Sequence, residues 1–201
     1  MAVILSPKDV TAVVVTTGKH DTREVIESLR PFGDLVIWDN SQFNDLKVYG
    51  RYHGASLGLS PFIYTQDDDT VIDWPALLDE WDDQWRILCN MPHRWHNAYK
   101  GTGICLVGFG TLFRREMIAE PFRRYDAAGF PRDGVFMREC DRVFTHENRQ
   151  FIDWTEVPMR QMSYSSAPDR MYVQQTTPGE YTEIRRRLKL IPGRLMRAAE
   201  A

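Results

Sequence analysis

Two apolar runs that enclose a helical segment restrict the fold of this chain more than any other feature of its sequence. Residues 11–16 are rich in β-branched side chains and show no alternation with polar ones, as is typical of a strand covered on both faces. A helix is expected over residues 22–29, where Thr22 can cap it, and residues 35–38 form the second run. Because a helical crossover joins parallel strands, this segment predicts an α/β fold.

A further strand, residues 62–65, leads directly to three consecutive carboxylates, Asp67, Asp68 and Asp69. Like charges this close repel one another and raise each other's pKa values, so a bound divalent cation is a simple compensation. The alternative is a solvated acidic loop, as most charge runs are. The position at the carboxyl end of a strand, where open α/β sheets bind ligands, favours the cation site.

The rest of the chain contains further predicted elements. Strands are expected at residues 46–49, 86–89, 104–109 and 151–157, and helices at residues 74–81, 112–125, 136–145 and 181–190. Residues 90–103 are expected to form an irregular covering loop, and residues 158–179 a lid or wrapping tail.

Composition limits the class of protein. With 201 residues, of which 43% are hydrophobic and 26% charged, the chain is expected to form one globular domain. A net charge of -3 disfavours nucleic acid as the main partner. The first seven residues lack the basic region of a signal peptide, and no run approaches membrane-spanning length, so we expect a cytoplasmic protein. Cys89, Cys105 and Cys140 are widely spaced and are expected to be buried thiols.

The sequence contains neither of the glycine-rich phosphate-binding loops, G-x-G-x-x-G or G-x-x-x-x-G-K-[ST]. A bound nucleotide would therefore need its diphosphate charge neutralised by other means. Asp67 and Asp69 lie two residues apart and point the same way in an extended chain, so one can bind a metal while the other holds a sugar hydroxyl. Oxygen ligands of this kind suit Mg²⁺ or Mn²⁺.

The order of these features resembles a known family. A strand ending in Thr16-Thr17, a helix, a strand ending in Asp39-Asn40-Ser41, an Arg51-Tyr52 segment and a strand leading to Asp-x-Asp is similar to nucleotide-diphospho-sugar glycosyltransferases of the GT-A fold. The likeness is to small bacterial or phage enzymes of the family 2 and exostosin-like groups. It covers residues 11–70 and is thin beyond Gly110.

The resemblance implies a Rossmann-like, mostly parallel mixed sheet flanked by helices, with an irregular C-terminal acceptor region. Residues 1–201 would form a single domain. Residues 8–110 would be the nucleotide-sugar-binding half, and residues 111–201 the acceptor-side half with a C-terminal helix.

Carried over by position, the resemblance gives Thr16 and Asp39 as residues that hold the base and ribose, and it places Arg51 near the nucleotide or its phosphates. Asp67 would lie near the ribose or donor sugar, and Asp69 would bind Mn²⁺ or Mg²⁺, with Asp67 a second metal candidate. The adjacent Asp68 leaves this register open by one residue. Asp39 is equally an ordinary turn-capping residue, and Arg51 an ordinary ion-pair partner.

The acceptor hydroxyl requires a base if the reaction inverts the sugar, and the family takes it from the start of a later helix. Asp141 is the first candidate here, Glu139 the second and Asp133 the third. Against this, Glu139–Arg142 and Arg138–Asp141 have the spacing of surface ion pairs on a helix. The sequence Glu-Cys-Asp, in place of the usual Glu-Asp, leaves the stereochemical outcome open.

Two further features are candidates for this site, one on the acceptor side and one at the metal. Gly108 and Gly110 are expected to let the backbone approach a sugar closely, unless they form an ordinary turn. His146 is a candidate third metal ligand.

These observations predict a hexosyltransferase-type enzyme that transfers sugar from a UDP- or GDP-sugar to a hydroxyl of a glycan, lipid, protein or modified base. One alternative is a sugar nucleotidyltransferase, although His20-Asp21-Thr22-Arg23 is a poor match to its glycine- and arginine-rich loop. The other is a catalytically silent sugar-nucleotide-binding or scaffold protein. The oligomeric state is left open.

Overall fold

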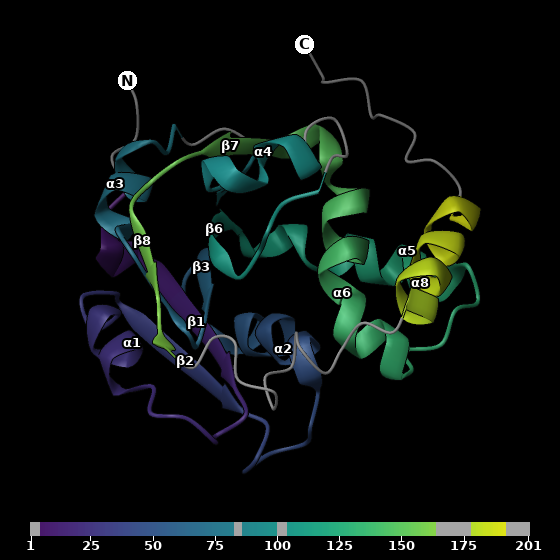
Figure 1. Ribbon diagram of the computed structural model, residues 1–201, viewed down its shortest axis with the longest axis horizontal. Helices are drawn as coiled ribbons and strands as arrows, with labels where there is room; N and C mark the ends of the chain where they lie inside the picture. The colour runs from purple at the N-terminus through teal and green to yellow at the C-terminus, as the bar shows by residue number, and fades with distance from the viewer. Residues whose placement is uncertain (1–4, 83–85, 100–103, 164–177, 192–201) are drawn as a thin grey trace.

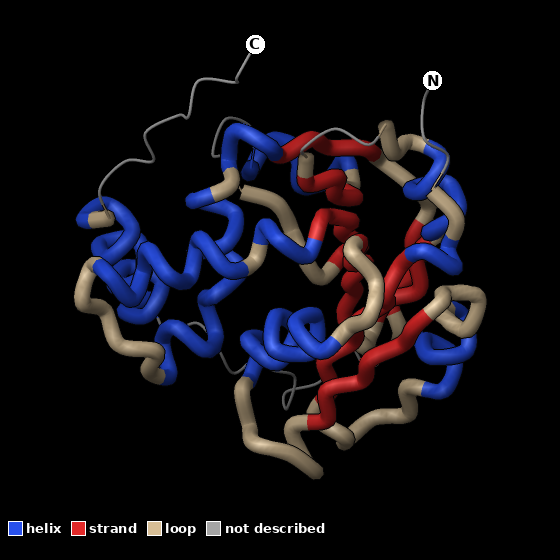
Figure 2. The backbone as a smooth tube through the Cα atoms, turned by 180° about the vertical axis from the view of Figure 1, so that it is seen from behind, coloured by secondary structure: helices blue, strands red, loops and turns tan. Residues whose placement is uncertain are grey.

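A mixed sheet runs through the protein with helices packed on both of its faces (Figures 1 and 2). The structure is a computed structural model and describes residues 5–82, 86–99, 104–163 and 178–191. Its sheet has six strands in the order β2 (Asp34–Asp39), β1 (Val10–Thr16), β3 (Phe62–Asp67), β6 (Phe109–Arg114), β5 (Ile87–Asn90) and β7 (Ile152–Thr155).

Only β6 runs against the other strands of this sheet. The strands β2, β1 and β3 pair in parallel, β6 pairs antiparallel with both β3 and β5, and β5 pairs in parallel with β7. The carboxyl ends of five strands and the start of β6 therefore lie along one edge of the sheet. This is the edge at which α/β sheets bind ligands.

Two hydrophobic cores cover the two faces, because successive strand residues point to opposite sides. Val13 and Ile63 belong to one core, and Val14 and Tyr64 to the other. The first core is covered by α2 (Gly50–Leu57), α5 (Ala119–Ala127), α6 (Gly134–Glu147) and α8 (Pro178–Leu190), and the second by α1 (Arg23–Ser28) and α3 (Trp74–Asp79).

The remaining described elements lie outside the six-stranded sheet. A second sheet of two antiparallel strands consists of β4 (Thr70–Ile72) and β8 (Met159–Gln161), and α4 (His93–Tyr99) follows β5. Short 3-10 helices complete the described elements: η1 (Pro7–Asp9), η2 (Lys47–Tyr49), η3 (Arg115–Met117) and η4 (Arg149–Phe151).

Most predicted elements are confirmed. The strand-helix-strand unit β1–α1–β2 is present with parallel strands, and β3 ends at the acidic residues. The fold class, an α/β protein with a mostly parallel mixed sheet and flanking helices, is also confirmed. All three cysteines are buried and free. Within the described part of the chain, no helix is long and apolar enough to cross a membrane.

Four predictions about local structure were wrong. The strand expected at residues 46–49 is the 3-10 helix η2, in which Val48 and Tyr49 pack on the first core. Residues 93–99 form a helix within the predicted irregular loop. The strand expected at residues 104–109 begins only at Phe109, so residues 112–114 are strand and not the start of a helix.

The fourth concerns the C-terminal half, where most of residues 109–161 lie in helices and strands and not in an irregular acceptor region. Part of the predicted lid is β8, and residues 178–179 begin α8. Residues 164–177 lie outside the described residues.

Asp133 connects two helices and has a structural role, although its sequence position made it a third base candidate. It caps α6 by accepting a hydrogen bond from the Phe136 amide at 3.0 Å. Its carboxylate also accepts two bonds from Arg187 of α8, at 3.0 and 2.7 Å. The Arg187 guanidinium lowers the pKa of this carboxyl.

We expect Asp133→Asn to destabilise the protein by about 1 kcal/mol and Asp133→Ala by about 2 kcal/mol, measured by urea unfolding. Asparagine keeps the cap and loses only the partly exposed ion pair, whereas alanine loses both. Because the folded pKa lies below the unfolded value of about 4, this stabilisation is present above that pH and lost as the pH falls through it. A cost of Asp133→Asn that does not shrink in acid would contradict the ion pair.

Candidate functional site

The carboxyl ends of β1, β2 and β3 bring three of the predicted site residues together. Thr16 lies opposite Asp39 in the register of β1 and β2, and Asp67 lies opposite Val15 on the other side of β1. Residues that are 51 positions apart in sequence thus become neighbours at one sheet edge.

Thr16 and Asp39 are both engaged in local turns. The Thr16 hydroxyl accepts a hydrogen bond from the Gly18 amide at 3.1 Å. Asp39 accepts bonds from the amide and hydroxyl of Ser41, at 2.8 and 2.6 Å, and from the Gln42 side chain at 2.8 Å. These contacts are those of a turn-capping aspartate, so a ligand at this position would have to bind over an already ordered turn.

The acidic turn, residues 67–69, is held in place by the buried Gln66. The Gln66 amide donates to the Thr70 carbonyl at 2.7 Å and its oxygen accepts from the Tyr64 hydroxyl at 2.6 Å. The Thr70 hydroxyl donates to Asp69 at 3.1 Å. On the far side, the Met162 amide donates to the Asp69 carbonyl at 2.7 Å. The turn therefore has a fixed backbone on which carboxylates are presented.

Arg51 of α2 is the central residue of the site. Its side chain is 2% exposed, and its guanidinium donates one bond to Asp67 and another to Asp141 of α6. Burial lowers the pKa of Arg51, but the carboxylates of Asp141 and Asp67 raise it to a greater extent, so the group stays charged. The structure thus connects Arg51, Asp67 and Asp141, which were proposed from the sequence as separate candidates.

Tyr52, adjacent to Arg51, completes the support of Asp141. Its hydroxyl donates to the second carboxylate oxygen of Asp141 at 2.8 Å. Burial and the nearby Asp141 raise the Tyr52 pKa well above its ordinary value, so the hydroxyl keeps its proton and remains a donor. Asp141 accepts a bond on each oxygen, while its side chain is still 26% exposed.

Burial and neighbouring charges have opposing effects on the pKa of Asp67. Burial raises its pKa and the Arg51 charge lowers it, whereas Asp69, Asp141 and Asp68 raise it again, to a value of about 6. The carboxyl group is therefore ionised at neutral pH and takes up a proton in mild acid. Burial is the largest cause of this raised pKa, and the nearby carboxylates add to it while the single shared guanidinium opposes it.

Gly108 provides the space that the Asp67 side chain occupies. The Asp67 amide donates to the Gly108 carbonyl at 2.7 Å, and a Cβ atom on Gly108 would lie 2.1 Å from the Asp67 carboxylate. The expected close approach at this glycine is present, but the partner is a side chain of the acidic turn. Gly110, with a φ of +93°, adopts the left-handed backbone that glycine favours.

Two of the other predicted residues do not join this cluster. Glu139 is buried and accepts a bond from Arg142 at 2.6 Å, at a point where α6 departs from helical geometry. His146 contacts Glu147 at 3.1 Å and Arg149 at 3.2 Å. The Glu139–Arg142 pair expected from helix spacing is formed, whereas Arg138 pairs with Glu180 of α8 and leaves Asp141 to Arg51.

The acidic turn provides oxygen donors of the type that Mg²⁺ and Mn²⁺ prefer. In the described part of the chain no three His, Cys, Asp or Glu side chains gather as a complete metal site. Mg²⁺ is commonly held by one or two carboxylates together with substrate phosphates and water. Asp69, 6% exposed, and the adjacent Asp67 and Asp68 are the carboxylates that the acidic turn could offer to such a site.

Comparison with known proteins found no family model and no curated protein that matches this sequence. The assignment of function therefore depends on the site itself.

Sequence reasoning missed Tyr52 and Gln66 as site residues. Tyr52 entered only as the second residue of the Arg51-Tyr52 segment, without a role, and each residue acts through another, Tyr52 on Asp141 and Gln66 on the Thr70 carbonyl. The available signal was position, since each directly adjoins a residue that had been proposed.

We expect Arg51→Met to destabilise the fold by about 2–4 kcal/mol near pH 7.5, because two carboxylates would lose their shared cation while keeping some contact with water. The Asp67 pKa of about 6 in the folded protein lies above its value in the unfolded chain. Protonation of Asp67 in acid therefore stabilises the folded state, and its ionisation as the pH rises through about 6 destabilises the folded state. The cost of Arg51→Met should therefore be smaller at pH 5 than at pH 8.

The measurement is urea unfolding at both pH values, with Arg51→Lys as the matched variant. Lysine keeps the charge but lacks the planar fork that reaches two carboxylates, so an intermediate cost is expected. Equal costs of Arg51→Met at pH 5 and pH 8 would show that the guanidinium does not compensate these carboxylates.

Proposed function

We propose that this protein is a metal-dependent glycosyltransferase of the GT-A type, which moves a sugar from a UDP- or GDP-sugar to an acceptor hydroxyl. The observation that carries the proposal is the connection of the acidic turn, at the carboxyl end of β3, to Asp141 through the buried Arg51. This contact supports the proposal because the acidic turn and Asp141 of α6 share one guanidinium and therefore lie close together.

In this proposal, Asp69 and Asp67 hold Mn²⁺ or Mg²⁺ together with the donor diphosphate. The bound cation would stabilise the negative charge that grows on the leaving diphosphate. The absence of glycine-rich phosphate loops from the sequence supports this use of a metal, because the diphosphate requires a counter-charge. Thr16 and Asp39, at the ends of β1 and β2, are the neighbouring positions for the nucleoside.

Asp141 is the proposed base. The acceptor oxygen forms a bond to the anomeric carbon of the donor, the bond from that carbon to the phosphate oxygen breaks with its electron pair, and the acceptor proton passes to Asp141. Arg51 and Tyr52 fix the orientation of this carboxylate, and its exposed fraction of 26% leaves room for a hydroxyl. Glu139 is not favoured for this role because Arg142 holds it in a buried pair.

Asp69→Asn should abolish Mn²⁺-dependent binding of nucleotide-sugars. In the unaltered protein, one donor should raise thermal stability only with Mn²⁺ or Mg²⁺ present, and a ligand at 100 times its dissociation constant adds about 2.7 kcal/mol. Asp79→Asn, which removes an exposed carboxylate from α3, should change nothing. The proposal fails if no UDP- or GDP-sugar binds in the presence of either metal.

Asp141→Asn should lower kcat about 100-fold or more with the donor affinity changed only a few-fold, as is typical on removal of a general base. Turnover is followed by nucleoside diphosphate release, and thermal unfolding checks that the variant is folded. Donor binding without turnover in the unaltered protein, across a panel of acceptors, would instead favour the catalytically silent sugar-nucleotide-binding protein.

A further inference from the structure

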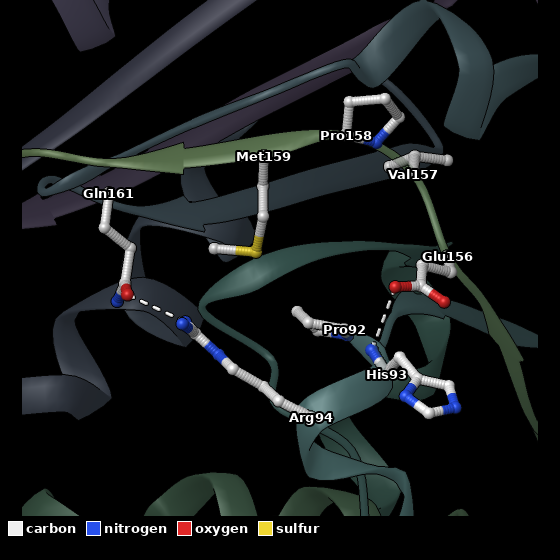
Figure 3. A pocket seen from close by; sticks show the side chains of 8 residues that line it. All are labelled: Pro92, His93, Arg94, Glu156, Val157, Pro158, Met159 and Gln161. Atoms are coloured by element: carbon white, nitrogen blue, oxygen red, sulfur yellow. Dashed lines mark hydrogen bonds between the residues drawn. The ribbon is translucent and has the colours of Figure 1, made fainter.

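A groove of about 570 Å³ lies between the start of α4 and the segment that connects β7 to β8 (Figure 3). Its volume falls within the range of ordinary small-molecule sites. Pro92, Val157, Pro158 and Met159 give it apolar walls. Behind one wall, the fully buried Asn90 accepts a hydrogen bond from the Val157 amide at 3.0 Å, which fixes the backbone there.

The groove adjoins the acidic turn. Gln161, one of its lining residues, lies opposite Thr70 in the register of β8 and β4. The next residue, Met162, donates its amide to the Asp69 carbonyl at 2.7 Å. A molecule in the groove would thus lie beside the position proposed for the donor diphosphate.

The two ends of the groove carry opposite charges. At one end the Arg94 side chain extends from α4 to β8 and donates to Gln161 at 2.8 Å (Figure 3). At the other end, the Glu156 carboxylate accepts a bond from the His93 amide at 3.0 Å. Met159 lies between them in the same view. A ligand with one anionic group would therefore have a single favourable orientation.

The Arg94 guanidinium is held by neutral neighbours. Besides Gln161, it contacts the ring of Trp95, whose centroid is 5.9 Å away, and no carboxylate of the described residues pairs with it. By contrast, Arg51 binds two carboxylates and Arg160 binds Glu24. A positioned guanidinium without a carboxylate partner is the group that binds carboxylate or phosphate oxygens best.

From these observations we infer that the groove binds the acceptor, and that the acceptor is a carbohydrate of one or two sugar units bearing a carboxylate or phosphate group. Arg94 pairs with the anionic group, the apolar walls contact the ring carbons, and Glu156 accepts from hydroxyl groups at the far end. The inference rests on the proposed function for its description of the ligand as an acceptor. The preference for an anion follows from the neutral surroundings of the Arg94 guanidinium in the groove.

The test measures binding by the full chain, without metal or nucleotide, of glucose 6-phosphate, glucuronate and glucose. We expect at least one of the two anions to bind in the millimolar range or tighter and glucose to bind at least about tenfold more weakly, because only an anion forms charge-assisted hydrogen bonds with Arg94. The two anions distinguish phosphate from carboxylate recognition. Equal affinity for all three sugars, or no binding of either anion, would overturn the inference.

Three variants assign the effect to Arg94. Arg94→Gln should weaken anion binding about tenfold or more, and Gln161→Glu should do the same by placing a carboxylate against the guanidinium. Arg160→Gln is the matched control, because it removes a positive charge from the opposite face of the same strand, where Arg160 pairs with Glu24. Anion binding that survives both groove variants would contradict the role of Arg94.

Donor binding is measured separately with UDP- and GDP-sugars and Mn²⁺. If Arg94→Gln weakens only donor binding, Arg94 serves the diphosphate and the inference about the acceptor is wrong. If the anion binds in the groove but no nucleotide-sugar binds anywhere, the proposed function and the acceptor role fail together. If the unaltered protein binds a nucleotide-sugar but binds the two anionic sugars no better than glucose, the inference about the acceptor is wrong and the proposed function stands.

Discussion

A guanidinium buried between two carboxylates determines the geometry of the candidate site. A charge removed from water is tolerated only when it has close partners of opposite sign, and Arg51 finds them in Asp67 of β3 and Asp141 of α6. Three segments that are distant in sequence must therefore assemble together. Aromatic packing strengthens this assembly, because the Tyr52 ring lies 4.9 Å from that of Phe122 and 5.0 Å from that of Phe144.

The reversed strand β6 shapes the same region in a different way. A strand that ran parallel to β3 would bring its carboxyl end to the edge where the carboxyl ends of the other five strands lie. Because β6 runs the opposite way, its start lies there, with Gly108 against Asp67. The acidic turn thus contacts the Gly108 backbone on one side. On the other side it contacts Met162, the residue after β8, whose amide donates to the Asp69 carbonyl.

The first half of the fold was predictable because β1 and most of β3 are buried on both faces and β2 is apolar over four consecutive residues. The apolar runs of β1 and β2 and the start of β3 leave little choice of structure, and the position of the acidic turn follows from them. Boundaries failed where the pattern was ambiguous. Val48 and Tyr49 resemble strand residues in sequence, yet they pack from a 3-10 helix, and Lys47 before them has a φ of 52°.

The individual residues of the candidate site were easier to propose from the sequence than the contacts between them. Asp67, Arg51 and Asp141 each follow from local sequence or from the family resemblance. Their association does not, because Arg51 and Asp141 are 90 positions apart and no periodicity relates them. The helical spacing of Arg138 and Asp141 even indicates a different pair, which Glu180 prevents by binding Arg138. Similarly, the charge contrast of the groove depends on β8 reaching α4, which local sequence does not encode.

The contact of Gly108 with Asp67 has a consequence for the evolution of this protein. The two positions share one volume, since an added Cβ at Gly108 would overlap the carboxylate of Asp67. Descendants that acquire a larger residue at one position must lose or move the side chain at the other. In relatives of this chain, therefore, glycine at this position and aspartate at the first position of the acidic turn should be inherited as a pair, and relatives without either should have lost the Arg51 connection as well.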